Sequence, residues 1–236
     1  MLVKNNLLYN DDGTQVEFRQ SPNIGSGVKD IRFILLHFDA ASNSTSAVNW
    51  LTAKQSGVSA DLHITRAGKV TQMAKFNQIT WHAGKSAWKG LTNLNKYAIG
   101  IEQENMGSVK GVYQDWTEVQ IQKCIDVCKA LVATYPSIKE ILGHEEVATP
   151  AGRKDDPGPK FPMARVRAEV FGNQDPSTKN TTTGVNLRAG AGTNFAIVEE
   201  LKKGVEVNVL EVKGDWSRVF ICSIKKEGWI FSKYLA

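Results

Sequence analysis

The sequence is poor in cysteine and contains no long apolar run. Three cysteines among 236 residues are too few for the disulfide framework of a small secreted domain. No apolar stretch approaches the roughly 18 to 20 residues that span a bilayer. The opening stretch "MLVKNNLLYNDDG" turns polar too early for a secretory signal peptide. We therefore expect a protein made in the cytoplasm, without a cleaved signal and without membrane insertion.

The sequence also lacks a strong excess of positive or negative charge. The formal net charge is +5 at pH 7, which favours anionic partners such as nucleic acid or a bacterial cell wall, but also fits an ordinary solvated surface. No run of Lys and Arg is interleaved with aromatic residues, so we do not expect a nucleic-acid partner. The hydrophobic fraction of 42% is enough for a sizeable core, in one large domain or in a medium and a small one.

One segment separates two different sequence patterns. Residues 171–184, "FGNQDPSTKNTTTG", contain few apolar residues and many Gly, Pro, Ser, Thr and Asn residues, a composition typical of linkers. We therefore predict a first domain at residues 1–172, a linker at 173–183 and a second domain at 184–236.

Strand-like and helix-like segments mix before this linker. "IRFILLHF" and "YAIGIEQEN" have the pattern of buried strands, residues 46–57 that of a short helix ending at Gly57, and "LHITRAGKVTQMA" that of a hairpin turning near Gly68. This mixture predicts an α/β domain with a mixed central sheet flanked by helices. After the linker, short alternating runs divided by glycines predict a small all-β barrel of SH3 size.

Two of the cysteines lie in a segment with helical periodicity, "TEVQIQKCIDVCKALVATYP". Thr117 and Gln120 have the spacing of a capping box at its start. Cys124 and Cys128 fall on its apolar face, so we expect small core residues, with a metal or redox pair as the alternative.

Polar residues stand on the buried strands. His37 follows Phe33 and Leu35 on one face, at the end of its strand, where a satisfied histidine without function is the alternative. Glu102 and Glu104 share one face of the strand "IGIEQE". Two such carboxylates are costly to bury unless they line a polar cleft or pair with cations. An edge strand with a wet face is the other explanation.

The stretch "GHEEVATPAGRKDDPGP" holds the remaining candidates. His144 comes directly after an apolar run, and Asp155 and Asp156 follow twelve residues later, with Lys154 before them. The prolines after the aspartates stiffen the loop. Two histidines and one carboxylate are the usual protein ligands of a catalytic zinc site, so this set indicates a metal hydrolase.

The ordered motifs "ILLHFDA", "TWHAGKS", "AIGIEQEN" and "GHEEVATPAGRKDDPGP" resemble the zinc-dependent N-acetylmuramoyl-L-alanine amidases of the type 2 amidase family. That family includes phage lysozyme-like amidases, muropeptide-recycling amidases and peptidoglycan recognition proteins. The resemblance covers roughly residues 28–172. Separately, "VNLRAGAGTNFAIVEELKKGVEVNVLE", with the following "DWSRV" and "KEGWIFSKYL", resembles a bacterial SH3 domain of the kind that binds cell walls.

The resemblance implies one Zn²⁺ held by His37, His144 and Asp156. It further implies that Glu102 acts as the base and that Lys154 stabilises the oxyanion.

Several neighbouring residues have less definite roles. The resemblance places Trp81 and His82 in a substrate-wall motif. Asp61 stands where recycling amidases often carry a histidine linked to substrate contacts, which leaves the subsite preference open. We expect His63 to be a structural strand residue, whereas Glu104 is either a neighbour of the site or solvated.

The alternation of side chains along an extended loop indicates which of Asp155 and Asp156 faces the cleft. Neighbouring residues of an extended loop point in roughly opposite directions. Lys154 and Asp156 then face the cleft together, while Asp155 faces out.

These features predict an amidase that hydrolyses the amide between the lactyl group of N-acetylmuramic acid (MurNAc) and L-alanine in peptidoglycan. A wall-binding second domain favours polymeric wall over small muropeptides, with action at the wall after release or specialised export, as by an endolysin or an effector. The alternatives are a cytosolic muropeptide-recycling amidase and a non-catalytic peptidoglycan recognition module. The presence of all three candidate ligands is an argument against the latter.

Overall fold

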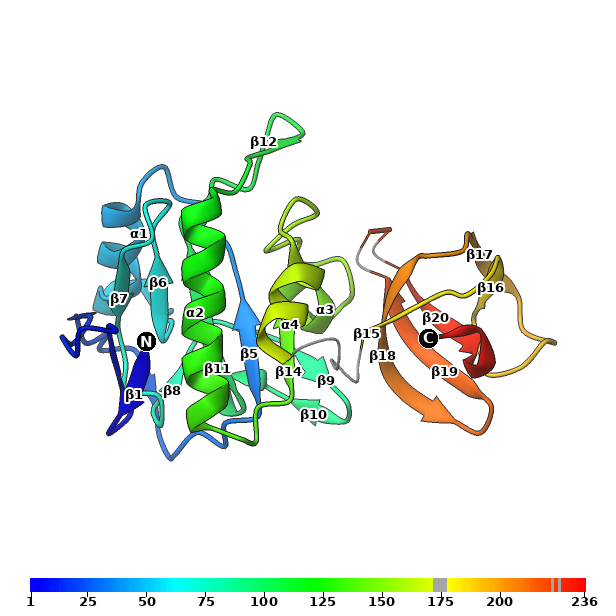
Figure 1. Cartoon of the computed structure of the whole chain (residues 1–236), viewed down its shortest axis with the longest axis horizontal. Helices are drawn as coiled ribbons and strands as arrows, with labels where there is room; N and C mark the ends of the chain where they lie inside the picture. The colour runs from blue at the N-terminus through cyan, green and yellow to red at the C-terminus, as the bar shows by residue number, and fades with distance from the viewer. Residues whose placement is uncertain (172–177, 222, 225) are drawn as a thin grey trace.

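A mixed six-stranded sheet forms the centre of the larger part of the molecule (Figure 1). The computed structural model describes residues 1–171, 178–221, 223–224 and 226–236. The strand order is β14-β5-β11-β6-β7-β3. The strands from β14 to β6 are parallel, whereas β7 is antiparallel to β6. The bounds are β3 Glu17–Phe18, β5 Phe33–Leu36, β6 Leu62–Ile64, β7 Val70–Gln72, β11 Ala98–Gln103 and β14 Glu140–Gly143.

Alternation along the central strands gives the sheet two different faces. Ile34 and Leu36 of β5 share one hydrophobic cluster with Ile101 of β11 and with residues of helix α2 (Glu118–Thr134). Figure 1 shows α2 running along this face, and α4 (Met163–Phe171) packs beside it. Leu35 points to the opposite face and belongs to a second cluster. Glu102 of β11 and His37, the residue that follows β5, also lie on this opposite face.

Short elements surround the central sheet. Four two-stranded pairs are β1 Leu2–Lys4 with β2 Leu7–Tyr9, β4 Ile24–Gly25 with β8 Ile79–Thr80, β9 Ala87–Trp88 with β10 Leu91–Thr92, and β12 Ser108–Val109 with β13 Val112–Tyr113. The short helices are α1 Ser44–Leu51, α3 His144–Val147 and the 3₁₀ turns η1 Lys54–Ser56 and η2 Leu94–Lys96. No helix in the described part of the chain combines the length and hydrophobicity of a membrane span.

Residues 178–236, here called the C-terminal β-region, form a second six-stranded sheet in the order β15-β18-β19-β20-β16-β17. Its elements are β15 Thr178–Asn180, β16 Val185–Arg188, β17 Ile197–Leu201, β18 Glu206–Lys213, β19 Trp216–Ile221, β20 Lys226–Phe231 and η3 Ser232–Tyr234. The predicted combination of an α/β part with an all-β part is confirmed. The predicted domain boundaries stay a prediction: residues 172–177 of the linker lie outside the described residues, and residues 178–180 pair with β18.

The C-terminal β-region packs against the end of the central sheet near α3 and α4 (Figure 1). Leu210 of β18 and Phe220 of β19 share a hydrophobic cluster with Leu142 of β14 and Val147 of α3. Full burial of such a side chain contributes roughly 1.5 to 3 kcal/mol. The two parts are therefore joined by an apolar contact next to β14, the strand that ends just before His144.

Local predictions agree with the structure in part. The hairpin turns at Gly68, whose φ of +78° is the left-handed conformation that glycine favours. The helix expected to end at Gly57 ends at Leu51, because Ala53 is extended and a separate 3₁₀ turn follows. Cys124 and Cys128 are free thiols buried in the core, as expected.

The predicted capping box at the start of α2 is half formed. Thr117 accepts a hydrogen bond from the amide of Gln120. The side chain of Gln120 turns away and donates to the carbonyls of Ile64 and Glu104. This side chain therefore ties α2 to the sheet instead of closing the cap.

Candidate metal centre and cleft

Three parallel strands bring their carboxyl ends together on the face opposite α2. Leu36 of β5 pairs with Ile101 on one side and with Gly143 on the other. The residues that follow these three are His37, Glu102 and His144. Ligands of open α/β sheets bind at such carboxyl ends. Residues 42 to 107 positions apart in the chain therefore become neighbours by strand register. Because β11 lies between β5 and β6, the edge-strand explanation for Glu102 is wrong.

His37, His144 and Asp156 form a compact cluster of buried donors. The Nδ1 atoms of the two histidines are 3.0 Å apart. Asp156 Oδ2 lies 2.8 Å from His37 Nδ1 and 3.1 Å from His144 Nδ1. All three side chains are nearly inaccessible to solvent. Among the described residues, these three side chains each place one ligand atom closely enough to the others to hold a metal ion.

In each histidine ring, the hydrogen bond made by the outer nitrogen determines whether the other nitrogen has a lone pair free to bind a cation. His144 Nε2 is 3.0 Å from the carbonyl oxygen of Ala83, so this nitrogen must carry the hydrogen. His82 Nε2 likewise faces the carbonyl of Ala98, at 3.4 Å, which leaves His82 Nδ1 as an acceptor. His37 Nε2, 3.0 Å from His82 Nδ1, is then the donor between those two rings.

Both Nδ1 atoms in the cluster consequently present lone pairs to the same point as the Asp156 carboxylate. Three acceptors at hydrogen-bond distance with no hydrogen among them repel one another unless a cation lies between them. Metal-ligating histidines ordinarily donate their other ring N–H to a partner in this way. The donor set therefore fits a metal ion.

The surroundings of His37 and Asp156 favour the protonation states in which these two groups can bind a metal. Burial, together with the neighbouring His144, lowers the pKa of His37 to about 4, so its imidazole is neutral at pH 7. Burial alone would raise the pKa of Asp156, but its contacts with the side chains of His144 and His37 lower it below its usual range. Asp156 is therefore an anion beside the neutral ring of His37.

Glu102 is the carboxylate with the most unusual surroundings. Its Oε2 atom is shielded from solvent and has no hydrogen-bond partner in the described part of the chain. Burial, followed by the negative charges of Asp156 and Asp39, raises the pKa of Glu102 well above its usual value, while Lys154 opposes this rise. A half-buried carboxyl with an unpaired, shielded oxygen in a cleft is a candidate for proton transfer.

The two adjacent aspartates have different partners. Asp155 accepts a hydrogen bond of 2.8 Å from the hydroxyl of Tyr113, away from the histidines. Asp156 contacts both histidines. Lys154 is half-buried and lines the same cleft. Asp156 thus contacts the histidines as the register argument expected, but Asp155 also lines the cleft and does not simply face out.

A cleft of about 520 Å³ opens over this cluster. Trp81 lines one wall, with 37% of its surface exposed. Trp50 of α1 lines it as well and is 55% exposed, although the sequence pattern does not distinguish it from a core residue of a short helix. Exposed aromatic rings beside a polar centre are suited to stacking on a sugar or a peptide group.

His82 lies at the cleft, but its ring is packed onto β11. A Cβ atom built on Gly100 would come within 2.4 Å of the His82 ring. Its Nδ1 atom accepts from His37, so His82 supports a member of the donor cluster in addition to lining the cleft. The sequence had suggested only a substrate wall.

The residues with open roles have structural partners. Asp61 is fully buried and forms an ion pair of 2.6 Å with Lys29, so it does not line the cleft. His63 is also buried, with Nε2 2.8 Å from Asp39. Glu104 accepts from the backbone amide of Arg66.

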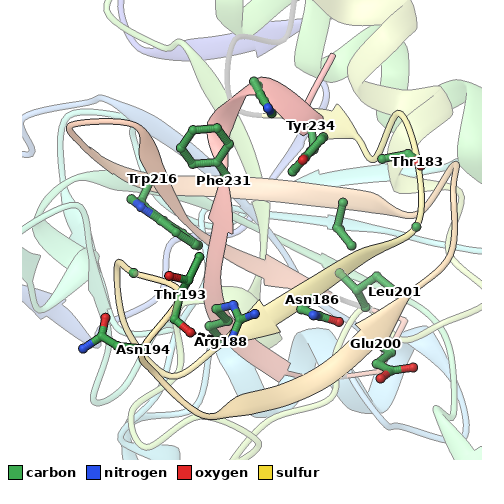
Figure 2. Close-up of a pocket in the computed structure, with 14 residues that line it drawn as sticks. Thr183, Asn186, Arg188, Thr193, Asn194, Glu200, Leu201, Trp216, Phe231 and Tyr234 are labelled. Atoms are coloured by element: carbon green, nitrogen blue, oxygen red, sulfur yellow. Dashed lines mark hydrogen bonds between the residues drawn. The ribbon is translucent and has the colours of Figure 1, made fainter.

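A second groove lies on the C-terminal β-region, with a volume of about 1050 Å³. Figure 2 shows Trp216, Phe231 and Tyr234 along one side and Asn186 and Arg188 along the other. The rings of Trp216 and Phe231 are 5.5 Å apart, edge to face. This arrangement offers aromatic stacking surface together with polar and cationic groups.

Comparisons with known proteins give a family match for the larger α/β part and another for the C-terminal β-region. Residues 27–159 match the Amidase_2 family, described as N-acetylmuramoyl-L-alanine amidase, and residues 183–236 match the bacterial SH3 domain family. The 1,6-anhydro-N-acetylmuramyl-L-alanine amidase AmpD of Escherichia coli K12 is 39% identical over 114 residues, covering 48% of this chain and 58% of AmpD. The N-acetylmuramoyl-L-alanine amidase AmiD of the same organism is 34% identical over 154 residues, covering 60% of this chain and 54% of AmiD.

A solved structure shows the same fold. E. coli AmiD in complex with the substrate anhydro-N-acetylmuramic acid-L-Ala-D-γ-Glu-L-Lys superposes with a TM-score of 0.54 and 30% identity, over 70% of this chain and 66% of that one. In sequence, the matches span less than two thirds of the length of AmpD or AmiD.

Proposed function

The chain belongs to the N-acetylmuramoyl-L-alanine amidase family, and from this premise we propose that it is a zinc-dependent amidase. Its substrate would be the amide bond between the lactyl group of MurNAc and the L-alanine of a peptidoglycan stem peptide. One observation carries the proposal: the lone pairs of His37, His144 and Asp156 converge at one point, in the cleft that also contains the unpaired carboxyl of Glu102.

His37, His144 and Asp156 would hold the zinc. Two histidines and one carboxylate are a frequent ligand set of catalytic zinc, which leaves further positions open. Zinc bound there supplies Lewis-acid polarisation of oxygen atoms in the cleft. His82 and the carbonyl of Ala83 orient the two imidazoles through their outer nitrogens.

Glu102 would transfer the proton that amide hydrolysis requires. It accepts a proton from the attacking water and returns it to the leaving amine of L-alanine. A group that does both needs a pKa nearer the working pH than that of an exposed glutamate, and burial raises the pKa of Glu102 in that direction. Such proton transfer typically contributes about 10² to 10⁴ in rate.

Lys154 and the tryptophans would stabilise and position the substrate. The Lys154 ammonium lines the cleft and is suited to the negative charge that develops on the amide oxygen. Trp81 and Trp50 offer exposed rings to the sugar or the stem peptide. Both relatives named above act, by their names, on an N-acetylmuramyl-L-alanine bond, which supports this substrate class.

The C-terminal β-region would hold the enzyme on polymeric wall. Its groove of Trp216, Phe231, Tyr234 and Arg188 offers stacking surface and a cation to an anionic glycopeptide. Attachment through a second site raises the local substrate concentration without any new catalytic contact. We therefore favour cleavage of intact wall, with the protein acting outside the cytoplasm after release or specialised export. The resemblance to AmpD makes recycling of small muropeptides the competing candidate.

Digestion of two substrates tests the proposal. Purified peptidoglycan and a soluble anhydro-MurNAc-tripeptide are incubated with the full chain, with a chelator, and with chelator followed by Zn²⁺. We expect intact stem peptides beginning at L-alanine, only when zinc is available, and faster release from wall than from the soluble compound. Glu102→Gln is the control, with zinc content kept and activity reduced about 10²-fold or more.

Each alternative result has a clear meaning. Release of disaccharides would refute the amidase assignment, and activity that resists chelation would refute the metal. Cleavage of the soluble compound alone would identify a recycling enzyme. Wall binding without any cleavage would identify a recognition module.

A further inference from the structure

Arg167 is the largest fully buried side chain of the described residues, with 1% of its surface exposed. It lies on α4, and its guanidinium makes contacts in three directions. Nη2 donates to both carboxylate oxygens of Glu146, at 3.0 and 2.7 Å. Nε donates to the carbonyl of Ile141 at 2.8 Å, and Nη1 donates to Asn208 Oδ1 at 2.7 Å. The planar guanidinium has several N–H donors that are satisfied at once, so it fixes the relative positions of the groups that accept its hydrogen bonds.

Two of these contacts lead directly to the donor cluster. Ile141 belongs to β14, whose end carries His144. Glu146, held by Arg167, accepts the backbone N–H of Gly143, the residue before His144. The amide of Glu145 donates to the carbonyl of Asp156 at 3.0 Å. The short helix α3 therefore connects both His144 and the Asp156 loop to the guanidinium.

The third contact leads to the other part of the molecule. Asn208 lies on β18 of the C-terminal β-region and is buried. Thr178 of β15 also lies within 3.4 Å of Arg167 Nη1. Close by, Leu210 and Phe220 pack against Val147 of α3. The C-terminal β-region thus contacts α3 through both a hydrogen-bonded network and an apolar one.

We propose that Arg167 is a positioning residue through which the C-terminal β-region holds α3, and with it His144 and Asp156, in the geometry that binds metal. The region then has a role in the catalytic part that is separate from wall attachment. The inference rests on the proposed zinc site. It predicts that perturbing a contact between the two parts, far from the cleft walls, weakens metal binding.

The test uses the full chain and conservative variants. Arg167→Lys keeps the positive charge but loses the planar set of N–H donors. Asn208→Ala removes only the acceptor that the C-terminal β-region offers to Arg167. Arg165→Lys is the matched control, because Arg165 lies on the same helix but is partly exposed and pairs with Glu118. For each variant we would measure zinc affinity by competition with a chromophoric chelator, the visible spectrum of bound Co²⁺, and hydrogen exchange at the Gly143 amide without metal.

For Arg167→Lys we expect zinc affinity to fall about 10- to 100-fold, the range seen when supports of metal ligands are changed. The Co²⁺ spectrum changes and the Gly143 amide exchanges faster. For Asn208→Ala we expect smaller changes in the same direction, and for Arg165→Lys none. With zinc saturating, kcat falls in Arg167→Lys while KM stays unchanged, because the cleft walls are untouched.

Specific results would overturn the inference. A folded Arg167→Lys protein with the zinc affinity and Gly143 exchange of Arg165→Lys would show that the contact is merely structural. If Arg167→Lys does not fold, Asn208→Ala decides, and unchanged zinc affinity there refutes the inference. If the unaltered chain binds no zinc, the proposed function itself fails, and Gly143 exchange still tells whether Arg167 holds α3.

Discussion

Asp155 and Asp156 are adjacent carboxylates with different surroundings. Asp156 is buried against His37 and His144, whereas Asp155 accepts from the Tyr113 hydroxyl. A ligand set depends on where each carboxylate points, so one residue of register decides which aspartate can hold the metal.

We predict that Asp156→Ala loses bound zinc and nearly all activity, because a three-ligand site loses its only anionic ligand. Asp155→Ala keeps stoichiometric zinc, since only its hydrogen bond to Tyr113 is removed. Metal content after dialysis, measured by elemental analysis, checks both. Zinc loss only in Asp155→Ala would mean that the register deduced here is off by one.

Glu102 and Lys154 are coupled by charge, which makes the pH dependence informative. A glutamate that serves as a base acts when ionised, so under the proposed role of Glu102 we expect kcat/KM to rise as pH increases through its pKa. The Lys154 cation lowers that pKa. Removing the cation in Lys154→Met therefore raises the pKa of Glu102 and moves the acidic limb of the kcat/KM profile to higher pH.

In the same variant, kcat falls about 10²- to 10³-fold if Lys154 also stabilises the oxyanion. Lys154→Arg is the control, because it keeps the charge and should leave the acidic limb in place. A limb at the same pH in Lys154→Met and the unaltered chain would contradict the coupling. pH profiles of kcat/KM on a soluble muropeptide provide the measurement.

At the scale of the element, β11 carries the candidate base Glu102 and, at Gly100, leaves space for the ring of His82. Gly100 donates its amide to Asp61 and leaves room for the His82 ring. Ile99 and Ile101 on the other face belong to the core beneath α2. The strand therefore needs a residue without a side chain at one position of its cleft face.

We predict that Gly100→Ala displaces His82 and so removes the support of His37. Its Cβ would meet the His82 ring at 2.4 Å, a distance that forces a shift. We expect a stability loss of about 1 to 3 kcal/mol and zinc affinity lowered about 10- to 100-fold. Calorimetry and chelator competition measure the two.

Ile99→Val on the opposite face is the matched control for this strand. It should lose about 0.5 to 1.5 kcal/mol of stability and keep its zinc affinity. Unchanged zinc affinity in Gly100→Ala would show that His82 does not support His37.

At the scale of the whole molecule, two grooves lie on two different sheets. The metal cleft belongs to the central sheet, and the aromatic groove belongs to the C-terminal β-region. If the second groove serves attachment, changes there should alter wall binding without altering turnover of a small substrate.

We predict that Trp216→Ala lowers cosedimentation with purified peptidoglycan at least severalfold, since stacking on one aromatic ring is worth about 0.5 to 1.5 kcal/mol. Hydrolysis of a soluble muropeptide stays unchanged. Trp229→Ala is the control, because Trp229 is a half-buried tryptophan of the neighbouring β20 that does not line the groove. Equal loss of wall binding in both variants would argue against a specific site.

Much of the candidate site is visible in the sequence because its chemistry is local. His37 follows an apolar strand, His144 follows another, and Asp156 stands in a proline-stiffened loop. Strand alternation places Glu102 on the same face as Gly100, and the structure has β11 as expected. These features depend on residue type and on the period of two, which a single sequence contains.

Other features depend on contacts between distant segments, and only the tertiary structure decides them. Examples are the support of His37 by His82, the pairing of Asp155 with Tyr113, and the position of Arg167 between α3 and β18. Trp50 on a short helix belongs here too. Periodicity determines which face of an element is apolar, but not which polar partner, from which other element, meets a given side chain. That choice follows from strand register and packing, so the sequence by itself determined the candidate ligands and their order, and the fold decided what holds them in place.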